Sequence, residues 1–127
     1  MDFEALFEKL EEGEIEEGVV SQLPVDQLNT RCPREVKVDQ ETLLGYAATF
    51  NRLATVKLLL DRGAEVDGTD GGGYTPLHNA CHHNHRELVQ LLRDQGADMT
   101  KMSGDGWSPM KLAFLHGNWR LAYDIMW

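Results

Sequence analysis

The fold is decided by one stretch of the sequence, Thr75-Pro76-Leu77-His78-Asn79-Ala80-Cys81, because two other segments repeat its pattern. Residues 42–48 and 108–114 align with it without gaps, and each begins 33 residues from the stretch. The register continues downstream, where Gly63-Ala64-Glu65-Val66-Asp67 matches Gly96-Ala97-Asp98-Met99-Thr100 at the same separation. A fixed period of this length predicts a solenoid built from one repeated structural unit.

Each repeated segment has the pattern of a helical hairpin. The hydroxyl of Thr75 can accept hydrogen bonds from the free N–H groups of a first helix, and Pro76 then occupies the first helical position. This helix is expected to end at residues that tolerate a positive φ, which are Asn51, Asn84 and Gly117. A second, apolar helix follows, and Gly63 and Gly96 are expected to end it in the left-handed conformation.

The Thr-Pro-Leu-His run at 75–78, the 33-residue period and the closing Gly96-Ala97-Asp98 together resemble the ankyrin-repeat family. The resemblance implies an all-α solenoid of helix-turn-helix hairpins with projecting β-turns, forming a single domain over residues 1–127. The expected units cover about residues 3–30 (the N-terminal cap), 37–69, 70–102 and 103–127 (the C-terminal cap), with an inserted loop at about 29–38. Unit 37–69 departs from the signature, since Leu43-Leu44-Gly45 replaces Pro-Leu-His.

The first 30 residues are interpreted as a degenerate opening unit. Gly13 is expected to end its first helix, and a second helix is expected from about Glu14 to Leu23. Residues 1–26 contain nine acidic residues and one base, whereas the rest of the chain is nearly neutral. This acidic stretch is interpreted as the solvated face of an end unit, which has a neighbour on one side only.

Composition limits the classes of function. The chain has 127 residues, of which 42% are hydrophobic, as expected for one folded domain. Its body has no broad basic surface, so nucleic-acid binding is not expected, and no apolar run approaches the roughly 18 residues that cross a bilayer. Two cysteines and an acidic start indicate an intracellular protein, expected in the cytoplasm or the nucleus and monomeric by default.

The sequence contains no complete catalytic constellation and no cofactor motif, so we expect neither enzymatic activity nor a cofactor. Cys81 occupies an alanine position of the repeat and is expected to be a buried thiol. Cys32 lies in the inserted loop beside Arg31 and Arg34. It is either a reactive thiol, whose pKa these cations lower, or an ordinary loop residue.

Five histidines offer another kind of chemistry. His78 and His82 are one helical turn apart, a spacing that can hold a metal ion when a further ligand completes the site. The resemblance instead gives His78 a hydrogen-bonding role within and between units, and a histidine is common in the family at the position of His85. The alternative function is a metal- or pH-responsive site built on His82, His83 and His116, and no metal site is assigned.

Tyr74 and Trp107 occupy the same repeat position, directly before the residue that caps the first helix. In the ankyrin family this position, the turn tips and the outer face of the first helix line a concave binding groove. Carried onto this sequence, the groove positions are Asp39, Glu41, Thr49, Phe50, Gly71, Gly72, Tyr74, His82, His83, Asp105, Trp107, Leu115 and His116. Tyrosine and tryptophan are also enriched in binding hot spots. The alternative is that Tyr74 and Trp107 only shield the adjacent turns.

We therefore expect a protein-interaction module, an adaptor or regulator, that binds an extended or helical segment of a partner protein. The partner contacts are expected at Glu41, Phe50, Tyr74, His82, His83, Asp105, Trp107, Leu115 and His116. The acidic end favours a partner with a basic segment. Trp119 and Trp127 are expected to cover the exposed end of the last unit.

Overall fold

The computed structural model describes residues 3–32 and 41–126. These residues form eight α-helices and one short 3₁₀ helix: α1 (Phe3–Glu12), α2 (Glu17–Ser21), η1 (Val25–Gln27), α3 (Leu43–Thr49), α4 (Leu53–Asp61), α5 (Pro76–His82), α6 (Arg86–Asp94), α7 (Pro109–Leu115) and α8 (Trp119–Met126). Within the described ranges the only strand-like pairing is an isolated antiparallel bridge between Arg31 and Thr42. The prediction of an all-α fold is confirmed.

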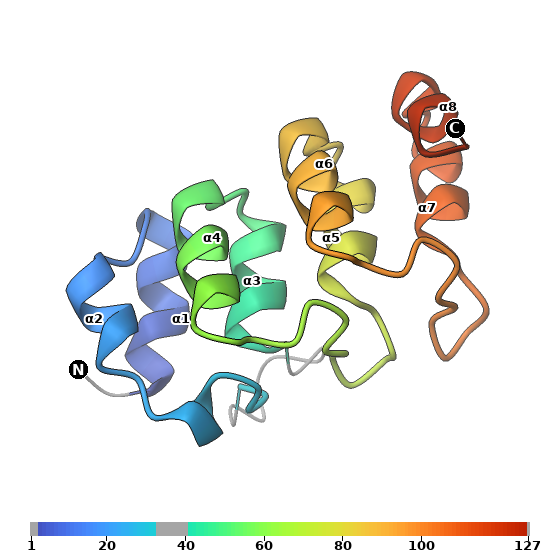
Figure 1. Cartoon of the computed structure of the whole chain (residues 1–127). Coiled ribbons are helices and arrows are strands. Elements are labelled where there is room, and N and C mark those ends of the chain that lie inside the picture. Colours follow the sequence, from blue (N-terminus) through green and yellow to red (C-terminus); the bar gives the residue numbers. More distant parts are fainter. Residues whose placement is uncertain (1–2, 33–40, 127) are drawn as a thin grey trace.

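The helices form hairpins that stack along one axis. The first helices, α1, α3, α5 and α7, pack on one another in a single row. Helices α4, α6 and α8 each pack on the first helix of their own hairpin, and α2 packs on α4. Figure 1 shows the hairpins following one another from the N-terminus to the C-terminus, with the connections α4–α5 and α6–α7 extending from one edge of the stack. This arrangement is the predicted solenoid.

Local side-chain chemistry sets where the first helices begin and end. Thr42, Thr75 and Ser108 cap α3, α5 and α7, each accepting a hydrogen bond from the backbone N–H three residues later. The backbone turns with a positive φ at the predicted positions, with 58° at Asn51, 58° at Asn84 and 74° at Gly117. These two signals explain why the row of first helices keeps the 33-residue register of the sequence.

Small residues allow the first helices to approach closely. Ala47 and Ala48 of α3, Ala80 and Cys81 of α5, and Ala113 of α7 are completely buried in one continuous core. The prediction of a buried Cys81 is confirmed, and this burial raises the pKa of its thiol to about 12. A thiol with this pKa carries almost no thiolate at neutral pH and is therefore a structural residue.

The prediction that Cys32 is a loop residue, reactive or ordinary, is wrong, because Cys32 is buried in the core. Its backbone N–H donates to the carbonyl of Glu41 at 2.8 Å, which fixes this segment against the start of α3. The neighbouring Arg31 donates from Nε to the Thr69 carbonyl at 2.9 Å. A thiol removed from solvent in this way cannot readily meet a reagent.

The opening unit also differs from the prediction, since α2 is shorter than the expected helix at both ends. The residues before it are extended, because they bind across to α4. The Glu14 carboxylate accepts from the Thr55 N–H at 2.9 Å, and the Ile15 N–H donates to the Thr55 hydroxyl at 2.9 Å. Gly18 further weakens helix formation, and η1 follows Pro24. These hydrogen bonds between units replace the helical hydrogen bonds that a longer α2 would have formed.

Several predicted features fall outside the described residues. These are most of the inserted loop, together with Arg34, Asp39 and Trp127. Among the helices that the structure describes, none has both the length and the apolar character needed to span a bilayer.

Candidate partner-binding groove

A groove of about 390 Å³ lies along the outer faces of α3, α5 and α7 and the turns before α5 and α7. Its lining residues are Glu41, Thr49, Asp70, Tyr74, His78, Asn79, His82, His83, Trp107, Leu112, Leu115 and His116. The structure therefore brings most of the predicted contact residues into one cavity. Asn79 and Leu112 were missed, although they occupy one repeat position, a turn before His82 and Leu115, and the register could have identified them.

Two predicted contacts lie outside this lining. The Phe50 ring is half-buried, packs against the core and lies 5.0 Å from the Tyr46 ring, so it does not line the groove. Asp105 lines a neighbouring hollow of about 540 Å³ between the turns, together with the predicted positions Gly71 and Gly72. Tyr74 lines both cavities and connects them.

Tyr74 is held in place by the turn of the following unit. Its hydroxyl donates to both carboxylate oxygens of Asp105 at 2.8 Å, and the Ser103 hydroxyl donates to the same carboxylate at 2.5 Å. The bond from Ser103, followed by that from Tyr74, holds the pKa of Asp105 below its usual range, while burial and the Asp105 bond raise the pKa of Tyr74. The pair is thus an ionised carboxylate bound to a neutral phenol, which fixes the ring at the groove wall.

His78 joins two units beneath the groove. Its Nδ1 accepts from the Thr75 N–H at 3.0 Å, and its Nε2 donates to the Trp107 carbonyl at 2.8 Å. The predicted hydrogen-bonding role within and between units is confirmed. Burial lowers the pKa of His78, so the neutral ring that these two bonds require is the stable form at neutral pH.

The remaining histidines form a cluster, which we call the histidine cluster: His82, His83, His85 and His116. His82, His83 and His116 line the groove, where they form its floor, and His85 lies beside them. The His82 ring centroid lies 4.0 Å from that of His116 and 4.6 Å from that of His83, and His83 stacks on His85 at 5.6 Å. Burial, and then the neighbouring imidazoles, lower the pKa of His82 and His83. His85 also donates from Nε2 to the Thr49 carbonyl at 3.0 Å, which ties the cluster to α3.

This cluster brings the predicted residues His82, His83 and His116 together, but their arrangement is not that of a metal site. Within the described residues, no group of three or more histidine, cysteine or carboxylate side chains is placed to hold a metal ion. The rings contact one another directly, whereas the ligands of a metal ion point their lone pairs at a common centre.

The groove has an acidic side and an apolar side. At the α3 side, the Glu41 carboxylate accepts from the Thr49 hydroxyl and from the Asn79 amide, both at 3.1 Å. The buried Asp70 carboxylate accepts from the N–H groups of Gly72 and Tyr74, at 2.8 and 2.9 Å. At the α7 side, Leu112, Leu115 and Trp107 provide apolar surface. A ligand that crosses the groove therefore meets carboxylates, imidazoles and then apolar side chains.

Comparison with known proteins agrees with the repeat pattern. Residues 44–93 match the family of ankyrin repeats (many copies). The chain is also similar to ankyrin repeat domain-containing protein 49 of Mus musculus, with 45% identity over 53 residues. The aligned segment covers 41% of this chain and 22% of the mouse protein, so the similarity concerns the repeats and not the whole relative. The family match shows that residues 44–93 contain ankyrin repeats, and the 33-residue register and the stacked hairpins are consistent with an ankyrin-repeat solenoid.

Proposed function

We propose that this chain is a protein-interaction module that binds a segment of a partner protein in the groove. Ankyrin repeats are generally protein-interaction modules and are typically not enzymes. The observation that supports this function here is the groove itself. Three consecutive units contribute to its lining, and it combines Tyr74 and Trp107 with the floor of imidazoles. A concave surface with fixed aromatic anchors and a few polar groups is suited to hold a peptide segment.

The two sides of the groove define the chemistry of that segment. The Glu41 carboxylate favours a basic side chain at the α3 side. Leu112 and Leu115 favour an apolar side chain at the α7 side, where Trp107 adds an aromatic face. The proposed ligand is therefore a segment in which a lysine or arginine precedes or follows a large apolar residue. The acidic N-terminal unit favours the same positive charge at longer range.

Selection from a random peptide library on the folded protein tests this proposal. We expect enriched peptides that pair a basic residue with an apolar one, and we expect Tyr74→Ala and Trp107→Ala each to weaken their binding by about tenfold or more in calorimetric titrations. Gln90→Ala, on the exposed face of α6, is the matched control and should leave the affinity unchanged. Selected peptides that bind both groove variants with full affinity would show that the groove is not the binding site.

The histidine cluster favours a second candidate function, which is pH-dependent control of the groove. The pKa values of His82 and His83 are lowered by burial and by the neighbouring imidazoles, so both rings are neutral at neutral pH and gain positive charge on acidification. Acidification would therefore place positive charge on the floor and disfavour a basic ligand. The cytoplasmic or nuclear location remains a prediction from the sequence.

A further inference from the structure

The C-terminal end of the stack exposes positions that are buried in every internal unit. Met110 corresponds to Leu44 and Leu77, which are 1% and 0% exposed, yet it is 37% exposed itself. Phe114 corresponds to Ala48 and Cys81, which are both 0% exposed, and it is 51% exposed. In the internal units α5 covers the α3 positions and α7 covers the α5 positions. Among the described elements, none covers α7 in the same way.

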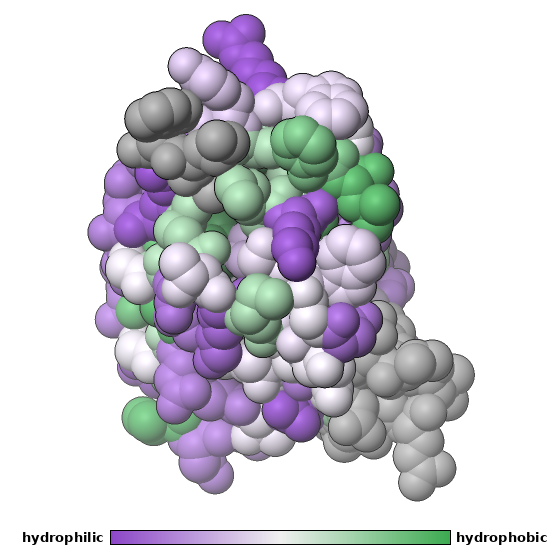
Figure 2. Space-filling model, turned by 90° about the vertical axis from the view of Figure 1, so that its right-hand side faces the viewer, coloured by the Kyte–Doolittle hydropathy of each residue, from purple (hydrophilic) through white to green (hydrophobic). Residues whose placement is uncertain are grey.

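The N-terminal end of the stack, formed by α1, exposes polar rather than apolar side chains. Its apolar residues Leu6, Phe7 and Leu10 are buried, and its exposed side chains include Glu8 and Glu12. The exposed face of α1 is therefore polar. At the C-terminal end, by contrast, apolar and aromatic side chains remain in solvent. Figure 2 looks onto this end and shows green and pale residues, which are apolar or weakly polar, gathered over its upper half.

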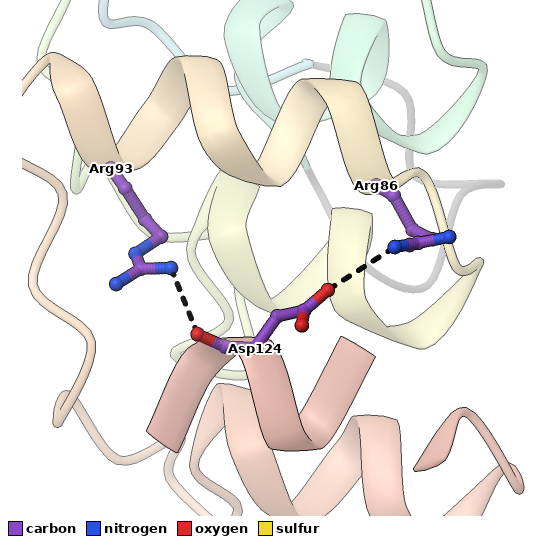
Figure 3. Close-up of polar contacts among 3 residues, drawn as sticks. All are labelled: Arg86, Arg93 and Asp124. Atoms are coloured by element: carbon purple, nitrogen blue, oxygen red, sulfur yellow. Dashed lines mark hydrogen bonds and ion pairs between the residues drawn. The ribbon is translucent and has the colours of Figure 1, made fainter. Parts of the chain in front are cut away.

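The exposed surface is fixed rather than fraying. Trp119 is 60% exposed, and its ring meets the Phe114 ring edge-on at 4.3 Å, so the predicted covering of the end by this tryptophan is partial. Helix α8 is attached to α6 through Asp124, whose side chain pairs with Arg86 and whose carbonyl accepts from Arg93, both at 3.2 Å (Figure 3). Met110, Lys111, Phe114 and Trp119 therefore form a preformed surface, which we call the end face.

We propose that the end face is a docking surface, separate from the groove, for an amphipathic helix of another protein that carries an acidic residue opposite Lys111. A helix is the expected form of the docked segment, because helices cover the equivalent positions of both internal units. Met110 and Phe114 are one helical turn apart, so they form a ridge that suits the apolar face of a helix. Tryptophan, phenylalanine and methionine are also the types enriched at interfaces.

Lys111 defines the charge of the occupant. It corresponds to His78, which donates across the boundary between units to the Trp107 carbonyl at 2.8 Å. A lysine at this position is also a hydrogen-bond donor, and its exposed side chain adds a positive charge that a carboxylate on the docked helix complements. Arg120 is exposed on the adjacent helix α8 and has the same sign.

A second copy of this chain satisfies these features less well. Pairing two end faces about a two-fold axis brings two Lys111 residues to one interface, where like charges repel. Stacking in head-to-tail order would offer the exposed carboxylates of α1 to Lys111, but among the large hydrophobic residues described in α1 none is exposed to cover Met110 and Phe114. Phe114 also replaces the small residues that let internal hairpins approach closely, which favours a single helix over another unit of the same kind.

Two cross-linked helical peptides of about 15 residues test the proposal, long enough to hold several helical turns. Both carry leucines on one face; one has flanking glutamates and the other has lysines at the same positions. We expect the acidic peptide to bind at least about tenfold more tightly in calorimetric titrations, since tenfold corresponds to about 1.4 kcal/mol. Phe114→Ser should abolish this binding, and Lys111→Glu should reverse the preference between the peptides. Tyr74→Ala, in the groove, is the matched control and should have no effect.

Both end-face variants change exposed side chains, so their thermal midpoints should match the unchanged protein and confirm that they fold. No saturable binding of either peptide, equal binding of both, or loss of binding in Tyr74→Ala would overturn the proposal. Sedimentation of the unchanged protein supplies a further test. Self-association that disappears in Phe114→Ser would assign the end face to a second copy and would equally reject a helix of another protein.

Discussion

At the scale of single residues, His78 shows how protonation and folding are coupled in this protein. Its Nδ1 accepts a hydrogen bond while its Nε2 donates one, and only the neutral imidazole can do both, because the imidazolium has two donors and no acceptor. His82 and His83, on the groove floor, also have lowered pKa values. In the folded state these three rings therefore bind protons less readily than in the unfolded chain.

We accordingly expect acidification to lower the stability. Histidines of the unfolded chain have a pKa of about 6.5, so above that pH the three rings contribute fully to the free energy of unfolding. This contribution is lost as the pH falls from there through the lower pKa values of the folded state. The thermal midpoint, followed by circular dichroism between about pH 7.5 and about pH 5, should fall, and each kcal/mol lost corresponds to about 4 °C. His82→Gln combined with His83→Gln should make the dependence shallower.

The chosen pH range separates the histidines from the carboxylates. Asp98 and Asp105 have lowered pKa values, so their contribution is present above about pH 4 and disappears only below it. A thermal midpoint that stays constant down to about pH 5 would contradict the account given for the three histidines.

At the scale of elements, the turns before α5 and α7 stack directly on one another. The Gly104 N–H donates to the Gly72 carbonyl at 2.9 Å, and Gly73 has a φ of +84°. A Cβ atom on Gly73 would lie 2.7 Å from the Gly104 nitrogen, which is too close for any real contact. Glycine is therefore needed at this position both for its backbone conformation and for the approach of the next turn.

Gly73→Ala is expected to destabilise the protein by about 2 to 3 kcal/mol, since the left-handed conformation alone costs an L-residue about 1 kcal/mol and the clash adds to it. Gly96→Ala is a matched control, because Gly96 has a φ of +88° but open space around its Cβ position. The free energy of unfolding, measured in urea, should fall more for Gly73→Ala than for Gly96→Ala. Equal losses would mean that the turns can separate without cost.

The elements also show which features a sequence can predict. The caps at Thr75 and Ser108 and the break at Asn84 depend on the residue's own side chain or backbone, so the repeat pattern identified them. The start of α2 depends on Glu14 binding Thr55, and such a distant contact leaves no local signal.

The same distinction applies to the candidate site. Tyr74, Trp107 and the histidines of the floor followed from the register, because equivalent positions in a solenoid face the same side. Phe50 also followed from the register, but its ring turns to Tyr46 and the core, and the choice between these orientations is made by packing. The burial of Cys32 likewise depends on its pairing with Glu41.

At the scale of the whole molecule, charge is distributed along the stack. The acidic residues of the opening unit lie at one end, and Lys111 and Arg120 lie at the other. Long-range attraction between the protein and a charged ligand mainly increases the association rate. Salt weakens this effect, because it screens charges that are separated by more than a Debye length. The N-terminal unit can therefore assist a basic ligand without contacting it.

Replacing Glu12, Glu16 and Glu17 by glutamine should slow association of a basic groove peptide severalfold and leave its dissociation rate unchanged. Stopped-flow measurements at about 0.01 M and about 0.15 M salt, where the Debye length falls from about 30 Å to about 8 Å, should show the difference only at the lower concentration. Lys57→Gln, on the exposed face of α4, is the control for a change of charge elsewhere. A faster dissociation would instead indicate direct contact.

Three consecutive hairpins contribute to the groove lining, and this division has a consequence for how binding and unfolding are linked. In a solenoid each hairpin contacts only its neighbours, so a terminal hairpin can open while the others remain folded. Opening of the α7–α8 hairpin would remove Leu112, Leu115 and His116 from the groove in a single event. A ligand that contacts all three hairpins binds only when the last one is folded, so binding stabilises that hairpin. The apparent affinity then decreases with the fraction of molecules in which the hairpin is open.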